Sequence, residues 1–206
     1  MKTREITNST RTSKWMQCPS TKTEFPGLAY IYPLNELIIV EEKDALHDVI
    51  GTPGICYTIF NNQGQKVFLA VQDRRCKTFD VKIFNYYGNE VIQVKRLYKL
   101  CLNKALVWAP PGNFAGSVNE VKRYVNTYLV KNKDGEVVLM IKAQGLFQYV
   151  YSILSGDEEV GIVKKHWGIA AVLSVNNFGI SFPVGADVTD KAVLLGACLL
   201  IGCLKY

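Results

Sequence analysis

The stretch AVLLGACLLIGCL, Ala192–Leu204, contains 13 residues and no charged side chain. Asp190 precedes it and is typical of a helix N-cap, so the sequence predicts a helix over about residues 190–204. Such a helix has no polar stripe to face water and must be buried in protein or in lipid. It extends about 20 Å, whereas the hydrocarbon core of a bilayer is about 30 Å thick. Burial in protein is therefore favoured, and a short membrane anchor that ends at Lys205 is the alternative.

A short hairpin pattern recurs four times in the middle of the chain. Its turns carry Gly, Asn or Asp, which tolerate positive φ, at residues 61–64, 85–88, 133–135 and 155–157. Apolar and polar residues alternate beside these turns, which is typical of half-buried strands. Further strands are predicted at Leu28–Tyr32 and Leu37–Glu41. Two strand pairs on each side of Pro110-Pro111-Gly112 suggest either an internal duplication or a simple succession of hairpins.

Many antiparallel strands with few helices would leave exposed sheet edges, and closing the sheet removes them. A barrel also needs something to fill it, and Gly196 and Gly202 would let the strands approach the C-terminal helix closely. The sequence thus predicts an all-β closed barrel that encloses this helix. The central residues of the helix are Ala192, Leu195, Gly196, Cys198 and Leu199.

The composition indicates one intracellular domain. A chain of 206 residues with 49% hydrophobic residues can bury a core without disulfides. We expect residues 25–206 to form this domain and residues 1–24, which show no signal-peptide architecture, to form a flexible arm. The six cysteines lack CxxC spacing and are expected to be free thiols. The absence of GxSxG, HExxH, P-loop and dinucleotide glycine patterns argues against a conventional enzyme with a catalytic site.

Several separated blocks, which together cover nearly the whole chain, carry a family resemblance. They are Trp15-Met16, Pro26–Tyr30, Asn61–Val67, Ala109–Gly112, Gly161–Trp167, Asn176–Pro183 and Lys191–Cys198. With these blocks the chain resembles the phospholipid scramblases, whose domain is similar to the C-terminal domain of tubby proteins. The resemblance implies an antiparallel barrel of about 12 strands around the C-terminal helix. It also implies bidirectional movement of phospholipids between membrane leaflets, without covalent chemistry and often in response to calcium.

The resemblance places calcium in the stretch 173–185, where family members carry several aspartates. The corresponding oxygen ligands here would come from Ser174, Asn176, Asn177, Ser181 and Asp187. Calcium takes six to eight oxygen ligands and is attracted less by neutral oxygens than by carboxylates. Calcium binding is therefore predicted to be weak, and no other cofactor is expected. Asp187 and Asp190 are also consistent with a turn residue and a helix cap, respectively.

Membrane attachment is the second point at which the chain departs from the family. The family's acylated cysteine cluster is reduced to Cys101, and one acyl chain holds a protein only marginally on a membrane. Eight Lys and Arg between residues 74 and 104 stand against Asp80 and Glu90, so charge can add a second attraction to an anionic leaflet. For any single lysine, a solvated strand face is the alternative. The candidate basic residues are Arg74, Arg75, Lys77, Lys95, Arg96 and Lys99.

The remaining expectations concern location and partners. Lys164-Lys165-His166-Trp167 matches a stretch that the family links to nuclear entry, although two lysines are a weak signal and these residues also fit a strand and turn. We expect the protein to be located at the cytoplasmic face of the plasma membrane, with the nucleus as a second location. Anionic phospholipids are the expected partners, with self-association on membranes. Nucleic acid is not expected, nor are WW and SH3 domains, because the family's Pro-rich arm is missing. A non-transporting module that binds anionic lipid or protein is the rival function.

Overall fold

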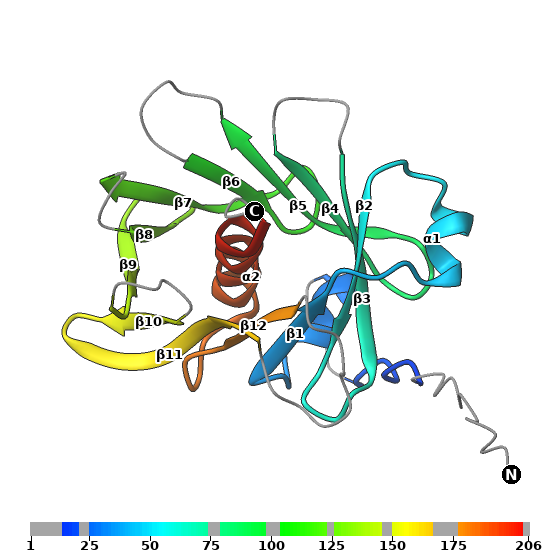
Figure 1. Cartoon of the computed structure of the whole chain (residues 1–206), viewed down its shortest axis with the longest axis horizontal. Coiled ribbons are helices and arrows are strands. Elements are labelled where there is room, and N and C mark those ends of the chain that lie inside the picture. The colour runs from blue at the N-terminus through cyan, green and yellow to red at the C-terminus, as the bar shows by residue number, and fades with distance from the viewer. Residues whose placement is uncertain are drawn as a thin grey trace, which may run out of the picture.

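The computed structural model describes residues 14–20, 25–73, 79–97, 104–122, 126–145, 150–166 and 177–203. Within them, twelve antiparallel strands form a closed barrel around one helix, α2 (Figure 1). The expected all-β barrel with a central helix is confirmed. The strands are β1 Glu36–Val40, β2 Ile55–Phe60, β3 Lys66–Gln72, β4 Asp80–Phe84, β5 Glu90–Leu97, β6 Lys104–Trp108, β7 Phe114–Lys122, β8 Thr127–Asn132, β9 Val137–Ala143, β10 Val150–Ser155, β11 Glu158–Lys165 and β12 Asn177–Ser181.

Each strand pairs with its neighbours in sequence, and β1 closes the barrel by pairing with β12. Three of the hairpin turns are built in the same way. The side-chain Oδ1 of Asn61, Asn85 and Asn132 accepts hydrogen bonds of 2.9–3.0 Å from the backbone N–H groups two and four residues later. The glycine three residues after each asparagine has a φ of +73° to +86°, which glycine adopts without steric cost. These asparagines therefore fix the geometry of the β2–β3, β4–β5 and β8–β9 turns.

The segment Pro110-Pro111-Gly112 is another turn of this series, and it connects β6 to β7. The N–H of Ala109 donates to the Asn113 carbonyl and the N–H of Asn113 donates to the Pro110 carbonyl, both at 2.9 Å, and Gly112 has a φ of +92°. Gly112 follows Gly88 by 24 residues, the same offset that separates Gly88 from Gly64. The strands are thus connected as a succession of hairpins, and the internal duplication that the sequence suggested stays a prediction.

Two short helices in the first quarter of the chain were not predicted from the sequence. The strand predicted at Leu28–Tyr32 is wrong, because Pro26–Ile31 form a 3₁₀ helix, η1, that begins at a proline. Residues 28–31 are all buried, so this apolar run carried no alternation that could distinguish a strand from a helix. Helix α1, Ala45–Ile50, was not predicted, and Asp44 caps it by accepting a hydrogen bond of 2.9 Å from the N–H of Leu46.

Part of the predicted N-terminal arm contacts the barrel. The N–H of Met16 donates to the Lys66 carbonyl at 2.8 Å, and the N–H of Lys66 donates to the Lys14 carbonyl at 3.0 Å. Trp15 forms a parallel bridge with Lys66, at the start of β3. The boundary between arm and domain near residue 25 stays a prediction, since residues 1–13 and 21–24 lie outside the described residues.

Helix α2 spans Val188–Cys203 and begins two residues before the predicted start. The Oδ1 of Asp187 accepts a hydrogen bond of 2.6 Å from the N–H of Asp190, so Asp187 is the cap. The assignment of Asp190 as the cap was wrong. Two aspartates three residues apart both suit a cap, and the first of them lies at the position from which an oxygen reaches the third residue of the helix.

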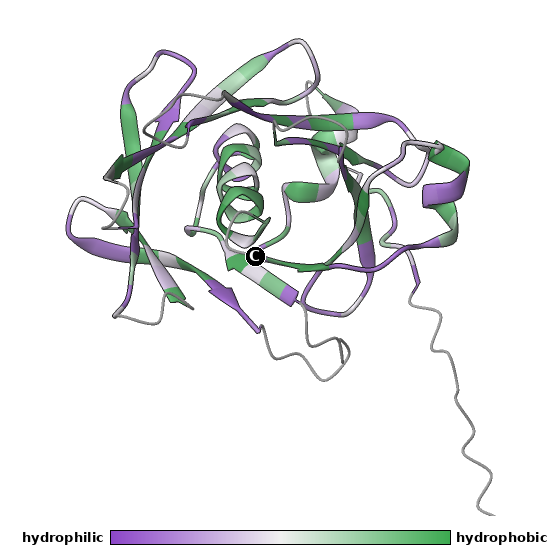
Figure 2. Ribbon diagram, turned by 45° about the horizontal axis from the view of Figure 1, so that its top comes forward, coloured by the Kyte–Doolittle hydropathy of each residue, from purple (hydrophilic) through white to green (hydrophobic). Residues whose placement is uncertain are grey.

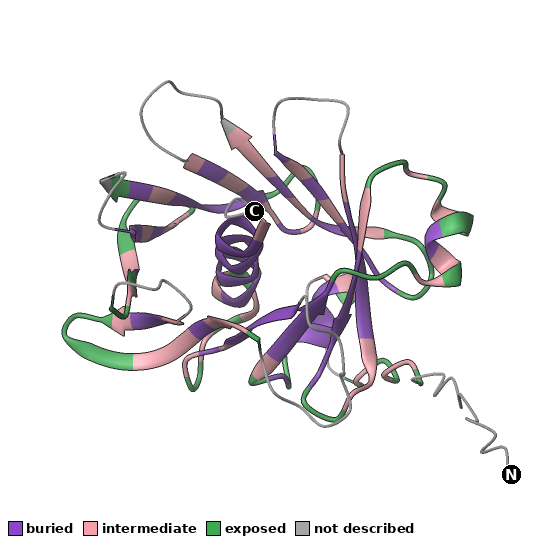
Figure 3. Cartoon of the chain, viewed as in Figure 1, coloured by how far each residue is buried: buried purple, intermediate pink, exposed green. Residues whose placement is uncertain are grey.

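Helix α2 fills the barrel. Figure 2 shows α2 inside the ring of strands. Its residues from Lys191 to Gly202 are all buried, including the five central residues predicted from the sequence (Figure 3). A Cβ atom on Gly196 would lie 2.7 Å from Val107, and one on Gly202 would lie 2.4 Å from the Phe178 ring. The predicted role of both glycines in close packing is confirmed. Since burying each large apolar side chain stabilises a fold by about 1.5–3 kcal/mol, α2 contributes a large part of the core.

One charged side chain enters the core with α2. Lys191 is 5% exposed, and its Nζ donates hydrogen bonds of 2.8 Å to the carbonyl oxygens of Tyr32 and Leu34. The ammonium lies 5.6 Å from the centre of the Phe182 ring. Burial lowers the pKa of Lys191. These contacts fix the first turn of α2 to the segment that leads into β1.

Candidate functional site

The axis of α2 gives the barrel two ends. At the turn end α2 begins, and the short turns after β2, β4, β6, β8 and β10 lie there. At the mouth α2 ends, next to the start of β12, as the contact between Gly202 and Phe178 shows. Successive strands of an antiparallel succession alternate in direction, so every second connection falls at the same end. The connections that follow β3, β5, β7, β9 and β11 therefore all leave the barrel at the mouth.

These five connections contain most of the membrane-related residues predicted from the sequence. Their residues outside the described part of the chain are 74–78, 98–103, 123–125, 146–149 and 167–176, which together hold five Lys or Arg and no Asp or Glu. The described residue Asp73 adds one acidic side chain directly after β3. The predicted residues Arg74, Arg75, Lys77, Lys99, Cys101, Trp167, Ser174 and Asn176 belong to these connections. The strand ends that flank the five connections add further basic residues. Among the described residues these include Lys95, Lys104, Lys142 and Lys164, while Asp80 and Glu120 are acidic residues at the same strand ends.

The other connections have the opposite charge balance. The described turns at the turn end, residues 61–65, 85–89, 109–113, 133–136, 156–157 and 182–187, contain four acidic residues and one basic residue. The sixth connection at the mouth joins β1 to β2 and spans residues 41–54. Its Asp44 is paired with Lys66. The other charged residues of this connection are the acidic Glu41, Glu42 and Asp48 and the basic Lys43, so the connection is also acidic. The basic part of the mouth is therefore a crescent over β3 to β11.

Lys95 and Arg96 are neighbours on β5 and face opposite sides of it. Lys95 forms an ion pair with Asp80, with 3.8 Å between Nζ and Oδ2, and is half-exposed. Arg96 lies on the same face as Val94, which packs near Gly196 of the central helix. The buried Nε of Arg96 has no hydrogen-bond partner within the described part of the chain. Of these two predicted basic residues, only Lys95 is therefore presented on the outer surface.

The stretch predicted as a nuclear signal lies at the edge of the mouth. Lys164 and Lys165 end β11, and His166 follows with a φ of +56° while its N–H donates to the Asn177 carbonyl at 2.9 Å. These three residues thus form a strand end and a turn, and the nuclear role stays a prediction. Burial lowers the pKa of Lys165, which lies on the same face as the buried Val163 and near the Cys203 thiol.

The two cysteines of α2 are protected thiols. Burial raises the pKa of Cys203 to about 12, against a smaller opposing effect from a hydrogen bond with Tyr57. Burial also raises the pKa of Cys198, well above its usual range. A thiol reacts through its thiolate form, so neither of these side chains is a nucleophile at neutral pH.

The described members of the predicted calcium set lie far apart. Asn177 starts β12 and Ser181 ends it, so they are separated by about 13 Å at about 3.3 Å per residue. Ser181 Oγ accepts a hydrogen bond of 2.9 Å from the N–H of Ile162, and Asp187 caps α2. These three residues cannot ligate one calcium ion, whose oxygen ligands lie within about 2.6 Å. Among the described residues, no group of three or more His, Cys, Asp or Glu side chains could hold a metal ion.

One buried polar cluster was not predicted from the sequence, and its contacts indicate a structural role. His47 is 2% exposed, and its Nδ1 accepts a hydrogen bond of 2.9 Å from the N–H of Asp44. Its Nε2 therefore carries the proton and donates to the Ala70 carbonyl at 3.3 Å. Asp44 also forms an ion pair with Lys66, whose Nζ lies 2.5 Å from Oδ2. These contacts attach α1 to β3.

Comparison with known proteins shows which family has this sequence pattern. The family model described as Scramblase matches residues 16–206. The chain belongs to the scramblase family. It is 32% identical to phospholipid scramblase 2 of Bos taurus over 91% of its own length and 74% of that protein. It is also 32% identical to human phospholipid scramblase 1, over 91% of this chain and 68% of that protein.

A solved structure supports the fold of this scramblase-family chain. The crystal structure of a protein from Arabidopsis thaliana matches with a TM-score of 0.51, at 12% identity over 84% of this chain and 92% of that chain. At this identity the match shows a related fold alone. In the described part of the scramblase-family chain, no helix is both long enough and apolar enough to cross a membrane.

Proposed function

We propose that this protein is a scramblase-like protein that moves phospholipids in both directions between the leaflets of a membrane. The observation that carries the proposal is the charge difference between the two ends of the barrel, in a chain whose relatives are named phospholipid scramblases. An acidic turn end is repelled by an anionic lipid surface, whereas each Lys or Arg at the mouth gains about 1 kcal/mol there. The mouth is therefore the end that contacts the membrane, at its cytoplasmic face.

Attachment by charge alone suffices for reversible binding. Three or four basic residues in contact with an anionic leaflet provide about 3–4 kcal/mol. Acylation of Cys101, in the 98–103 connection of the mouth, would add a second attachment on the same side of the molecule. We further propose that calcium dependence is weak, because the segment 173–185 contains no Asp or Glu.

The packed interior constrains the transport step. A polar headgroup that crosses hydrocarbon loses its hydration, which is costly unless polar groups replace the water. The barrel interior is filled by α2 from Lys191 to Gly202 and leaves no such path along its axis. Transport would therefore proceed beside the barrel, through thinning of the bilayer under the mouth or through association of several copies, or would require α2 to leave the barrel.

The same packing favours a second candidate function, a module that binds anionic lipid without transporting it. Purified protein in liposomes with fluorescent lipid distinguishes the two when dithionite quenching is followed with and without calcium. Quenching beyond the outer leaflet, with little change on adding calcium, is the result that scrambling predicts. Quenching equal to that of empty vesicles, while the protein still binds anionic vesicles, would contradict scrambling and support the binding module.

A pair of matched variants tests the role of the mouth in the same liposomes. The double variant Lys104→Glu with Lys142→Glu reverses two charges at the mouth, and Lys131→Glu with Lys133→Glu reverses two at or near the turn end. Loss of the attraction between two lysines and the anionic lipid costs about 2 kcal/mol of binding free energy. The mouth variant should therefore bind anionic vesicles more than tenfold more weakly. The turn-end variant should bind at least as well as the unmodified protein. Equal losses in both variants would contradict the proposed orientation.

A further inference from the structure

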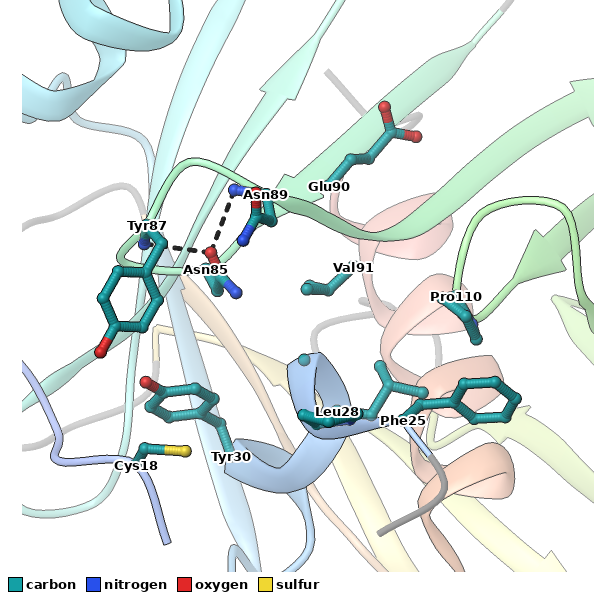
Figure 4. Close-up of a pocket in the computed structure, with 12 residues that line it drawn as sticks. Cys18, Phe25, Leu28, Tyr30, Asn85, Tyr87, Asn89, Glu90, Val91 and Pro110 are labelled. Carbon is teal, nitrogen blue, oxygen red and sulfur yellow. Dashed lines mark hydrogen bonds between the residues drawn. The ribbon is translucent and has the colours of Figure 1, made fainter.

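A cavity of about 400 Å³ opens at the turn end, between η1 and the turn that joins β4 to β5 (Figure 4). Segments far apart in sequence line it, from Cys18 through η1 to the turn at residues 85–91 and Pro110. Its volume lies within the range of about 300–1,000 Å³ that is usual for small-molecule sites. The cavity lies at the end of the barrel opposite the mouth, so it plays no part in the proposed contact with the membrane.

One part of the cavity is apolar. Phe25, Leu28, Val91 and Pro110 line it, and Leu28 and Val91 are buried in the core. A Cβ atom on Gly27 would lie 2.7 Å from Val91, so η1 packs directly against β5 beneath the cavity. The apolar wall is thus held by tight packing of two elements and does not need a ligand to form it.

The other part of the cavity carries neutral polar groups. The Oδ1 of Asn85 accepts hydrogen bonds of 3.0 Å from the N–H groups of Tyr87 and Asn89, which fixes the orientation of this side chain. Figure 4 shows the amide nitrogens of Asn85 and Asn89 at the same side of the open space, near the hydroxyl-bearing rings of Tyr30 and Tyr87. An amide –NH₂ group only donates hydrogen bonds. This side therefore suits an uncharged acceptor such as a carbonyl oxygen.

The charge around the cavity further limits the ligand. Of the described residues that line the cavity only Glu90 is charged, and it forms an ion pair with Lys82, with 3.3 Å between Nζ and Oε2. Within the described part of the chain, no basic side chain lines the cavity to neutralise an anion. A carboxylate or phosphate group of a ligand would be repelled by Glu90 and would meet no cationic partner among the described lining residues. A neutral ligand is consequently favoured over a fatty-acid anion or a phospholipid headgroup.

We propose that this cavity binds a neutral single-chain lipid, an acyl ester such as a monoacylglycerol. The chain lies against Phe25, Leu28 and Val91, and the ester carbonyl accepts hydrogen bonds from the amide groups of Asn85 and Asn89. At about 30 Å³ for a group the size of a water molecule, the cavity holds on the order of a dozen methylene groups, which matches a chain of moderate length. The inference does not rest on the proposed scrambling function.

Titration calorimetry of the full chain with monolauroylglycerol, below its micellar concentration, and with laurate in parallel tests this site. Monolauroylglycerol should bind about tenfold more tightly than laurate at pH 7.5, because laurate carries the unfavourable charge. Val91→Phe fills the apolar part and should abolish binding. Val137→Phe, at a half-exposed position near the turn end but outside the cavity, should leave it unchanged.

A second variant keeps the test decisive if Val91→Phe does not fold. Asn89 is exposed, and Asn89→Asp replaces a donor by an anion of the same shape, so binding of monolauroylglycerol should fall about tenfold or more. Equal affinity for laurate, binding unchanged by Asn89→Asp, or no binding to the unmodified protein would overturn the proposal. Lipid movement in the liposome assay should be unaffected by Asn89→Asp, which separates this site from the proposed function.

Discussion

The two ends of the barrel connect the same strands in different ways. At the turn end, Asn61, Asn85 and Asn132 hold short turns with their own side chains, and the first turn of α2 is attached through Lys191. At the mouth, the connections after β3, β5, β7, β9 and β11 carry five Lys or Arg and one acidic residue, Asp73. The turn end therefore fixes the fold and holds α2, while the mouth carries the excess of basic residues that we propose to contact the membrane. This division of roles can be tested by changing each end separately.

The largest effect concerns the helix that both ends enclose. Leu195 is fully buried in α2, and Leu195→Ala should lower the free energy of unfolding by about 2–5 kcal/mol, since it removes packed atoms and leaves a cavity. Val184→Ala, at a fully exposed position of the turn end, is the matched control and should change it by less than about 0.5 kcal/mol. Urea denaturation measures both. Similar small effects in the two variants would mean that α2 does not fill the barrel.

A smaller loss is expected at the attachment of α2 to the turn end. Lys191→Met leaves the buried carbonyl oxygens of Tyr32 and Leu34 without their donor, which should cost about 1–3 kcal/mol. Burial lowers the pKa of Lys191, so the unfolded chain binds more protons than the folded chain between the folded pKa and the ordinary lysine pKa. Stability from this group should therefore rise with pH across that interval.

Thermal unfolding of the unmodified protein and of Lys191→Met between pH 8 and pH 10.5 measures this difference. The unmodified protein should lose less stability than the variant as the pH rises. Only the unmodified protein has the contribution of Lys191 to the free energy of unfolding, which increases with pH. Parallel curves for the two proteins would contradict a buried, charged Lys191.

The asparagine turns should contribute less than the helix contacts. Asn132→Ala removes two hydrogen bonds to the backbone of its turn and should cost about 1–2 kcal/mol. Lys142→Ala, near the mouth end of the same hairpin, should cost less than about 0.5 kcal/mol. Chemical denaturation of the two variants compares the ends directly. An equal or larger loss for Lys142→Ala would mean that the mouth also determines stability.

Chemical labelling of thiols tests the burial of α2 in the native protein without any substitution. Iodoacetamide should modify the exposed Cys18 within minutes, whereas the buried Cys198, whose pKa is raised, should react only as fast as the protein unfolds. Mass spectrometry of peptides gives both rates. Repeating the labelling on anionic vesicles asks whether α2 leaves the barrel, because faster modification of Cys198 there would indicate release of the helix.

The sequence predicted the barrel and its central helix because both depend on repeated, local patterns. Turn glycines at regular offsets, alternating strands and an uncharged segment at Ala192–Leu204 each have few structural solutions. Helix η1 was missed because a fully buried apolar run has no period. The cap at Asp187 was misassigned because two aspartates stood at plausible positions.

The site residues were harder to predict because their partners are distant in sequence. Lys191 contacts carbonyls 157 and 159 residues away, and the cavity at the turn end combines η1 with β5 and Pro110. Arg74, Lys99 and Cys101 lie outside the described residues, in the segments that follow β3 and β5. The inward direction of Arg96 followed from the alternation of β5, which the charge count over residues 74–104 ignored.

The most direct test of the account compares the depth of the two ends at a membrane. A fluorophore attached through a cysteine at Lys142, near the mouth, or at Lys133, at the turn end, replaces one exposed lysine in either case, with the reactive native cysteines changed to serine. On anionic vesicles that contain a lipid quencher, the account predicts strong quenching at position 142 and little at position 133. Stronger quenching at position 133, or equal quenching at both, would contradict the assignment of the mouth as the membrane-facing end.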